Sequence, residues 1–255
     1  MKISGDYHTH TIYSHGKGTV RDNVISAIKA GLKEIAITDH GLNHFILGLR
    51  WWKVIKITEE VKKLQAEFPD INILVGIESN LIGTRGRIDI KPEEFKAFDI
   101  ILCGFHKPAR PDRLKDWFGM YMRSYVKFIP QGRRAIRRNT RAYTEAVKKN
   151  PIDVLTHINK GIRIDAGEIA RVCAEYGTYL ELSSRHIVFS ESDYKAMLDT
   201  DVKFILNSDA HRPEAVGDIR KAEEIIKKYN IPLERIVNID GKKPVFRSQK
   251  EHYEI

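Results

Sequence analysis

Residues 73–78 have the sequence I-L-V-G-I-E, a short apolar run that ends in a carboxylate. A run of this length is typical of a buried strand in a parallel sheet. Before it lies a helical pattern with Val61, Leu64 and Phe68 on one face, and before that pattern a second strand is predicted at 34–38. The order of strand, helix and strand predicts a βαβ unit, from which parallel sheets covered by helices are built.

The same order continues on both sides of this unit. A helix is predicted from Thr19, where T-V-R-D has the form of a capping box, to Gly31, and a first strand at 3–8 precedes it. Further strands are predicted at 100–105, 154–156, 178–182 and 202–207. Further helices are predicted at 169–176, 190–198 and 219–229, with Gly177 as the end of the first and Ser190 as the cap of the second. Seven strand-helix units predict a single-domain α/β fold, a distorted (β/α)7 barrel with one unit fewer than the eightfold barrel. An open doubly wound sheet is the alternative.

One long segment, 107–141, interrupts this order. It contains a loop rich in Pro and Arg, the aromatic stretch W-F-G-M-Y-M at 117–122, and a basic run towards its end. A long insertion within a compact domain is typical of an active-site lid, a partner surface or a mobile segment. We expect one domain over residues 1–246 that carries this basic insertion, followed by a polar tail at 247–255.

The composition restricts the partners and the compartment. The net charge of +9 and the isoelectric point near 9.4 favour anionic partners such as phosphorylated metabolites, nucleotides or nucleic acid. The two cysteines, Cys103 and Cys173, stand in apolar surroundings, which is typical of a reducing compartment. Without a signal peptide or an apolar run of membrane-spanning length, the sequence predicts a cytoplasmic protein with no membrane association. It does not specify an oligomeric state.

Histidines and acidic residues stand at the carboxyl ends of six of the seven predicted strands. In a parallel barrel these ends meet at one rim, so residues far apart in the sequence come together there. Imidazoles and carboxylates are ligands for catalytic transition metals, and nine of them would serve three ions if Glu78 bridges two. The candidate metal ligands are His8, His10, His15, His40, Glu78, His106, His157, Asp209 and His211.

Each motif has an ordinary explanation as well. A single histidine at a strand end, such as His106 or His157, is more often a polar residue with hydrogen-bond partners than a metal ligand. The presence of such residues at all six strand ends favours the metal site. Three further histidines, His44, His186 and His252, stay outside the set. His44 and His186 could line a pocket, but an ordinary loop or surface role is expected for both.

Together the motifs resemble those of the PHP (polymerase and histidinol phosphatase) family. They span nearly the whole chain, and they are similar to those of the stand-alone bacterial phosphatase-like members and of the PHP domain of bacterial family X polymerases. The matching motifs are H-T-H at 8–10 with His15, I-T-D-H-G at 37–41, G-I-E at 76–78, G-F-H at 104–106, T-H at 156–157 and N-S-D-A-H at 207–211.

The resemblance implies a PHP-type (β/α)7 barrel that holds three divalent ions, which are zinc, manganese or iron. By similarity, each ion would have its own set of ligands. The sets would be His8, His10, Glu78 and Asp209 for the first ion, Glu78, His106 and His157 for the second, and His15, His40 and His211 for the third.

The expected activity is metal-dependent hydrolysis of phosphate esters, with a phosphomonoester of a small metabolite or nucleotide as the substrate. A hydroxide that bridges two ions sharing Glu78 would attack phosphorus. The candidate catalytic residues are Glu78, Asp209 and His211, and the candidate substrate-binding residues are Arg212, Arg185, Lys107 and Arg110. Each of these arginines has an alternative role as a surface residue in a solvated loop.

Other functions remain open at this point. An exonuclease or phosphodiesterase is one, because Trp117, Phe118, Tyr121 and Tyr125 could stack on bases, although such spacing also suits packing. The basic run of Arg133, Arg134, Arg137, Arg138 and Arg141 has helical spacing and could form a phosphate lid, a nucleic-acid face or a solvated surface. A metal-binding auxiliary module for a polymerase-type partner is a further alternative. The amidohydrolase barrels also begin with H-x-H, but seven units, His15 and Glu78 in place of a bridging lysine disfavour them.

Overall fold

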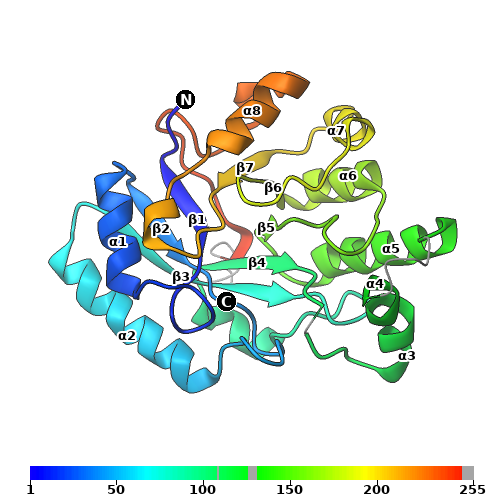
Figure 1. The fold of residues 1–255 in the computed structure, drawn as a ribbon, viewed down its shortest axis with the longest axis horizontal. Coiled ribbons are helices and arrows are strands. Elements are labelled where there is room, and N and C mark those ends of the chain that lie inside the picture. The colour runs from blue at the N-terminus through cyan, green and yellow to red at the C-terminus, as the bar shows by residue number, and fades with distance from the viewer. Residues whose placement is uncertain (108, 126–130, 249–255) are drawn as a thin grey trace.

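The strands form one parallel sheet that curls into a barrel. The computed structural model describes residues 1–107, 109–125 and 131–248. Each strand is hydrogen-bonded to the next along the chain, and Figure 1 shows the helices surrounding the strands. The strands are β1 (Gly5–Thr9), β2 (Glu34–Ile37), β3 (Asn72–Asn80), β4 (Ile100–Gly104), β5 (Val154–Leu155), β6 (Tyr179–Ser183) and β7 (Phe204–Asn207).

The first and last strands meet, which nearly closes the barrel. Thr9 forms an isolated parallel bridge with Ala210, and the backbone N–H of His10 donates to the carbonyl of Ala210 at 2.8 Å. Tyr7 also donates its backbone N–H to Oδ1 of Asn207 at 3.0 Å. The predicted distorted (β/α)7 barrel is therefore confirmed, and the alternative of an open sheet is wrong.

The helices follow the strands with the predicted cap residues in place. Thr19 forms the predicted capping box with Asp22, Ser190 caps a second helix in the same way, and Gly177 ends a third with a φ of 73°. The α-helices are α1 (Val20–Lys29), α2 (Trp51–Glu67), α3 (Leu114–Asp116), α4 (Met122–Tyr125), α5 (Arg133–Lys149), α6 (Ala166–Tyr176), α7 (Glu191–Leu198) and α8 (Arg220–Tyr229). Shorter turns are the 3-10 helices η1 (Pro92–Ala97), η3 (Pro213–Ala215) and η4 (Leu233–Arg235) and the π-helical turn η2 (Trp117–Tyr121).

The segment between β4 and β5 differs in part from the predicted insertion at 107–141. The structure places residues from Arg133 onwards in α5, which connects β4 to β5 as the other barrel helices connect their strands. Ala135, Ala142 and Ala146 lie on its buried side, whereas Arg133, Arg134, Arg137 and Arg141 are exposed. The end of the predicted insertion is thus a regular part of the barrel.

A register irregularity, of the kind that a β-bulge produces, lies in β1 next to its histidines. The pairing of β1 with β2 shifts register between Asp6 and Thr9. A bulge changes the alternation of side chains, so neighbouring residues can face the same side of a sheet. Tyr7 packs on Phe246 with ring centroids 5.2 Å apart, while Nε2 of His8 lies 3.4 Å from Oε1 of Glu78. Tyr7 therefore packs in the apolar interior, whereas the next residue, His8, lies at the rim.

An apolar layer fills the barrel beneath the rim. Because side chains alternate along a strand, a residue four positions before a rim residue faces the same side. The apolar residues four positions before His40, Glu78, His106 and Asp209 are Ala36, Leu74, Leu102 and Ile205, and all four are buried in one cluster.

The packed body extends past the predicted boundary at 246. The backbone N–H of Ser248 donates to Oδ1 of Asp153 at 3.0 Å, and Nη1 of Arg247 donates to the carbonyl of Val147 at 3.1 Å. The polar tail predicted at 247–255 is therefore wrong for these first two residues, and its remainder, with His252, lies outside the described residues. None of the described helices is long and apolar enough to cross a membrane.

Candidate metal centre

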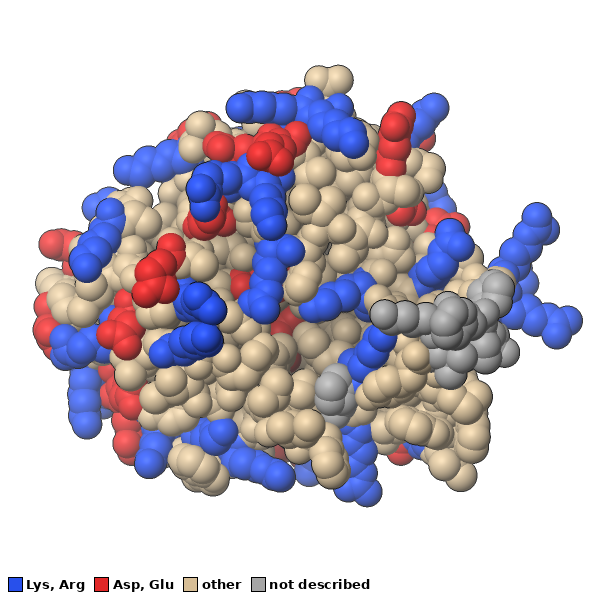
Figure 2. All heavy atoms as spheres, viewed as in Figure 1, with Lys and Arg blue, Asp and Glu red and all other residues tan. Residues whose placement is uncertain are grey.

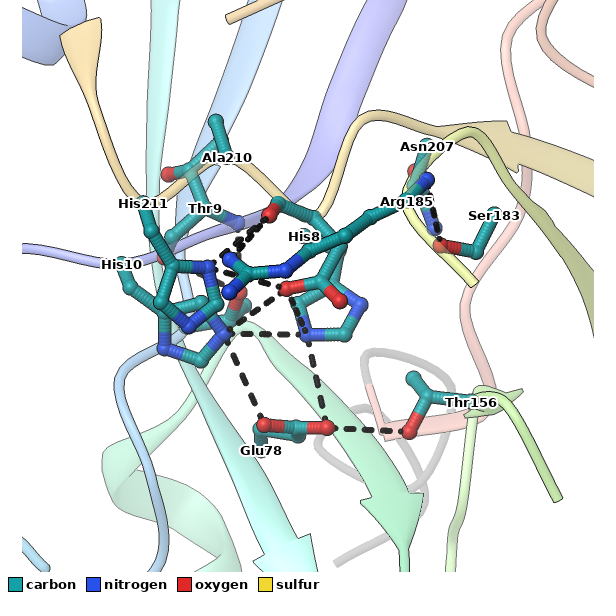
Figure 3. Close-up of polar contacts among 12 residues, drawn as sticks. His8, Thr9, His10, Glu78, Thr156, Ser183, Arg185, Asn207, Ala210 and His211 are labelled. Carbon is teal, nitrogen blue, oxygen red and sulfur yellow. Dashed lines mark hydrogen bonds and ion pairs between the residues drawn. The ribbon is translucent and has the colours of Figure 1, made fainter. Parts of the chain in front are cut away.

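All nine predicted metal ligands converge at the rim formed by the carboxyl ends of the strands. They fall into overlapping groups whose potential ligand atoms lie within 4.8 Å of one another. Figure 3 shows His8, His10 and Glu78 pointing towards one another across the barrel. The groups are His10, His15, His40 and His211; His8, His10 and Glu78; His8, His157 and Asp209; and His40, Glu78 and His106.

Glu78 lies at the centre of this arrangement, and both of its carboxylate oxygens face imidazoles. Its Oε1 is 2.9 Å from Nε2 of His157 and 3.2 Å from Nε2 of His106. Its Oε2 is 2.8 Å from Nδ1 of His40 and 3.6 Å from Nε2 of His10. Because potential metal-ligand nitrogens lie beside each of its two oxygens, the Glu78 carboxylate could be shared by two ions.

Asp209 is the second carboxylate that lies close to His8 and His10. Its Oδ1 lies 3.4 Å from Nε2 of His10, 3.7 Å from Nε2 of His8 and 3.3 Å from Nδ1 of His211. The backbone of Asp209 has a φ of 53°, and that of His157 has a φ of 29°. Such left-handed conformations are strained for residues other than glycine and cluster at functional sites.

Several buried polar atoms at the rim lack a hydrogen-bond partner. A buried polar atom without a partner is costly, and a bound metal ion supplies one. Nδ1 of His40 and Oε2 of Glu78 are close together but are not in hydrogen-bond geometry. The other such atoms among the candidate ligands are Nδ1 of His10, His15 and His157 and Oδ1 of Asp209. These side chains therefore fit divalent metal ions.

The charges at the rim also suit metal binding. Burial lowers the pKa of His10 to about 3 and the pKa of His15 to about 4, so both imidazoles are neutral and can act as ligands. Burial alone would raise the pKa of Glu78 and Asp209, but the surrounding imidazoles hold the pKa of both carboxyls well below the usual range. Both carboxylates are therefore ionised at neutral pH.

Two residues orient imidazoles of the site although the sequence analysis does not include them. They are Glu181 and Asn80. Nδ1 of His8 is 2.6 Å from Oε1 of Glu181, and Nδ1 of His106 is 2.8 Å from Oδ1 of Asn80. A hydrogen bond at Nδ1 fixes the ring and leaves Nε2 to bind a metal. Glu181 stands alone in an apolar strand, and Asn80 ends β3 two residues after Glu78.

Two histidines that were left outside the predicted set also reach the site. Nε2 of His186 lies 3.3 Å from Oδ2 of Asp209 and 2.7 Å from Nζ of Lys160. His44 is buried, and its ring stacks on that of His40 with centroids 5.0 Å apart. His44 is thus a loop residue, but it is buried and lines a cavity, as the alternative interpretation allowed, and the surface role is incomplete for His186. His44 follows the candidate ligand His40 by four positions, and His186 follows the end of β6 by three positions, so their closeness to strand ends is the signal that could have indicated them.

The four predicted substrate-binding residues lie on two sides of the rim. Arg185 extends across the histidines in Figure 3, with Nη1 3.4 Å from the carbonyl of Asp209. Arg185 and Arg212 line a cavity of about 540 Å³ together with Asp209 and His211. Lys107 and Arg110 line a separate cavity of about 780 Å³ beside His44. Figure 2 shows Lys and Arg side chains around the hollow at the middle of this face.

Comparison with known proteins agrees with this arrangement. The sequence model of the PHP domain family matches residues 6–234. A probable phosphatase of Shewanella pealeana is 28% identical, over 93% of this chain and 89% of the relative, and one of a Thermoanaerobacter species is also 28% identical, over 98% and 97%.

Solved structures show the same fold at low identity. Histidinol phosphate phosphatase from Lactococcus lactis, solved with zinc, L-histidinol and phosphate, has a TM-score of 0.62 at 20% identity and covers 97% of this chain and 98% of its own. The corresponding putative enzyme from Listeria monocytogenes has a TM-score of 0.63 at 16% identity, over 84% of this chain and 97% of its own.

Proposed function

Because this chain belongs to the PHP domain family, we propose that it is a metal-dependent phosphatase that hydrolyses phosphomonoesters of small metabolites or nucleotides. The main support for this proposal is that imidazole groups lie beside both carboxylate oxygens of Glu78. Curated relatives that match over nearly their whole length are named probable phosphatases. The positive net charge suits an anionic phosphorylated substrate.

We propose three divalent ions at this rim, with zinc, manganese or iron as the candidates. When bound, such ions lower the pKa of water and neutralise charge on phosphoryl oxygens. The distances among the side chains support the sets implied by the family resemblance. These sets are His8, His10, Glu78 and Asp209; Glu78, His106 and His157; and His15, His40 and His211.

The remaining residues of the site have complementary tasks in this proposal. Glu78, Asp209 and His211 hold the reacting centre in place, while Glu181 and Asn80 keep the imidazoles in one tautomer and orientation. Arg185 and Arg212 bind phosphoryl oxygens in this proposal, which is supported by their position in the lining of the cavity next to Asp209.

Phosphate release from a panel of phosphorylated metabolites, nucleotides and short oligonucleotides tests this function. The protein is loaded with manganese or zinc, and Glu78→Gln is the matched variant. We expect selective release that falls at least about 100-fold in the variant, together with a loss of bound metal measured by mass spectrometry. Cleavage of the oligonucleotides alone would identify a nuclease instead. The absence of release from every compound by fully loaded protein would contradict a phosphatase.

A further inference from the structure

A second cavity lies directly beside the candidate metal centre. It has a volume of about 780 Å³ and is formed by the loop at 42–50 and by the segment that follows β4. Hydrogen bonding joins these two parts, because the N–H of Arg110 donates to the carbonyl of Asn43 at 2.9 Å and His44 forms an antiparallel bridge with Ala109. We name it the aryl cavity because aromatic side chains line it.

His44 connects the aryl cavity to the metal ligands. It lines the cavity, its ring stacks on His40, and its centroid is 6.1 Å from that of His106. Its Nδ1 accepts a hydrogen bond from the backbone N–H of Leu47 at 3.0 Å, so the neutral ring carries its proton on Nε2. A phosphoryl group at the rim and the remainder of the same molecule in the aryl cavity would therefore be adjacent.

Three exposed aromatic side chains line this cavity, and two of them, Trp117 and Tyr125, are held in position. Phe45 is 80% exposed, and Trp117 and Tyr125 lie with ring centroids 6.1 Å apart. The hydroxyl of Tyr125 donates to the carbonyl of Lys107 at 2.7 Å, and Trp117 stacks on the fully buried Tyr121. Exposed aromatic side chains that are fixed in this way form a stacking surface at low entropic cost.

The charge of the aryl cavity is positive. Arg50, Lys107 and Arg110 line it, and no Asp or Glu of the described residues does. Nζ of Lys107 lies 5.7 Å from the centroid of the Tyr125 ring. The cavity thus offers aromatic faces, cationic groups and a volume within the range of small-molecule sites, about 300–1,000 Å³.

We propose that the aryl cavity binds the nucleoside leaving group of the substrate, and that the substrate is a nucleoside monophosphate whose base stacks on the aromatic side chains of the cavity. The inference rests on the proposed phosphatase function and narrows its substrate class. In the reaction the bond from phosphorus to the alcohol oxygen breaks, a water oxygen bonds to phosphorus, and the alcohol oxygen receives a proton. The alcohol remains stacked on Trp117 and Phe45 until it is released.

A matched pair of esters tests the inference. Adenosine 5′-monophosphate and ribose 5-phosphate contain the same phosphoester, but only the first carries an aromatic base. We expect kcat/KM to be about tenfold or more higher for the nucleotide, because stacking on an aromatic side chain contributes at this level. Trp117→Ala and Phe45→Ala should each reduce this ratio, and Trp117→Phe should restore most of it. Trp52→Ala removes an exposed tryptophan on α2 that does not line the cavity, so the ratio should stay unchanged.

The outcomes separate this inference from the proposed function. Hydrolysis of both esters with equal efficiency, or a ratio that Trp117→Ala and Phe45→Ala leave unchanged, would overturn the aryl cavity as the leaving-group site but leave a phosphatase. Calorimetric binding of adenosine, the product, provides a readout that does not require catalysis. A third outcome is that no ester is cleaved, but adenosine binds and Trp117→Ala abolishes that binding. This outcome would support the aryl cavity as a binding site and contradict the proposed phosphatase reaction. The absence of adenosine binding would overturn the site.

Discussion

Single residues at the rim act through their neighbours as much as through their own chemistry. Glu181 shows this, because it contacts two parts of the site at once. Its Oε1 lies 2.6 Å from Nδ1 of His8 and accepts from Nδ2 of Asn207 at 3.1 Å, and its Oε2 accepts from the backbone N–H of His157 at 3.2 Å. One carboxylate therefore orients two candidate ligands on different strands.

Replacing Glu181 with Gln should weaken metal binding although the side chain keeps its size. The amide has only one oxygen, so its NH2 group must face either His8 or the N–H of His157, which are both donors. We expect metal affinity and phosphate release to fall by about 10- to 100-fold. Titration against a chelator and an activity assay measure the two effects.

The exposed Glu175 on α6 is the matched control for this substitution. Glu175→Gln removes the same charge from the protein without contacting the rim, so it should leave both quantities unchanged. Equal effects of the two variants would show that the overall charge matters and that the contacts of Glu181 do not.

At this scale, what the sequence predicts depends on the residue type. Histidines and carboxylates that recur at six strand ends together indicate metal chemistry, which is why the sequence alone names all nine candidate ligands. Glu181 and Asn80 gain their importance from the atoms that they contact, and sequence distance does not encode those contacts. His44 was placed outside the site for the same reason, because its stacking on His40 requires the loop geometry.

At the scale of the elements, α5 shows why one helix was only partly predicted. The sequence pattern indicated helical spacing of its arginines but no large apolar residues at regular intervals. Its buried side contains mainly small or polar residues, which are Ala135, Asn139, Thr140, Ala142, Tyr143, Thr144, Ala146 and Val147. Close packing of a helix against its neighbours replaces the usual aliphatic stripe here, so the contrast between arginines on one side and small residues on the other is the pattern that indicates the helix.

Gly86 allows this close packing of α5. A Cβ atom at Gly86 would lie 2.4 Å from the carbonyl carbon of Glu145 and 2.5 Å from the backbone nitrogen of Ala146, and its φ is 78°. Gly86→Ala should therefore lower the free energy of unfolding by about 2–4 kcal/mol, because the new methyl group displaces the helix backbone and the residue is strained. Urea denaturation with a spectroscopic probe measures this change.

Gly132→Ala provides the comparison at the other end of the same helix. Gly132 precedes α5 with a φ of −70°, and no atom of the described residues lies within 4 Å of a Cβ placed there. We expect a change within about 0.5 kcal/mol for this variant. If both substitutions destabilised the protein equally, the close approach at Gly86 would not be the cause.

For the whole molecule, the sequence predicted the barrel because each unit carries its own local signals. Strand runs, the cap residues Thr19 and Ser190 and the end at Gly177 are local features, and the structure confirms each of them. The packing of the chain end was not predicted, because Arg247 and Ser248 are polar residues whose partners are 69 to 149 positions away.

Asp153 holds that chain end, and it should make the stability of the whole molecule depend on pH. Burial raises the pKa of Asp153 to about 6 from its model-compound value of 3.8. The folded protein therefore binds this proton more tightly than the unfolded chain, and the stability that it contributes is lost as the pH rises through 6. Between pH 5 and pH 8 the loss should be about 1 kcal/mol.

Comparison with Asp153→Asn isolates this effect from other titrating groups. The variant cannot ionise at this position, so the difference in unfolding free energy between variant and parent should shift in favour of the variant as the pH rises. Urea denaturation at the two pH values, with equal metal content, measures the shift. A difference that is the same at both pH values would mean that Asp153 keeps one protonation state throughout.

The pairing of β1 with β7 also governs the order of events during synthesis. Tyr7 bonds to Asn207, which lies 200 residues further along the chain. At a translation rate of about 5–20 residues per second, the open edge of the first strand waits roughly 10 to 40 seconds for its partner. His8 and His10 leave the ribosome early, but Asp209 and His211 join them only when the last strand has emerged. A nascent chain truncated before this point cannot assemble the full set of ligands, so complete metal loading would report that the barrel has closed.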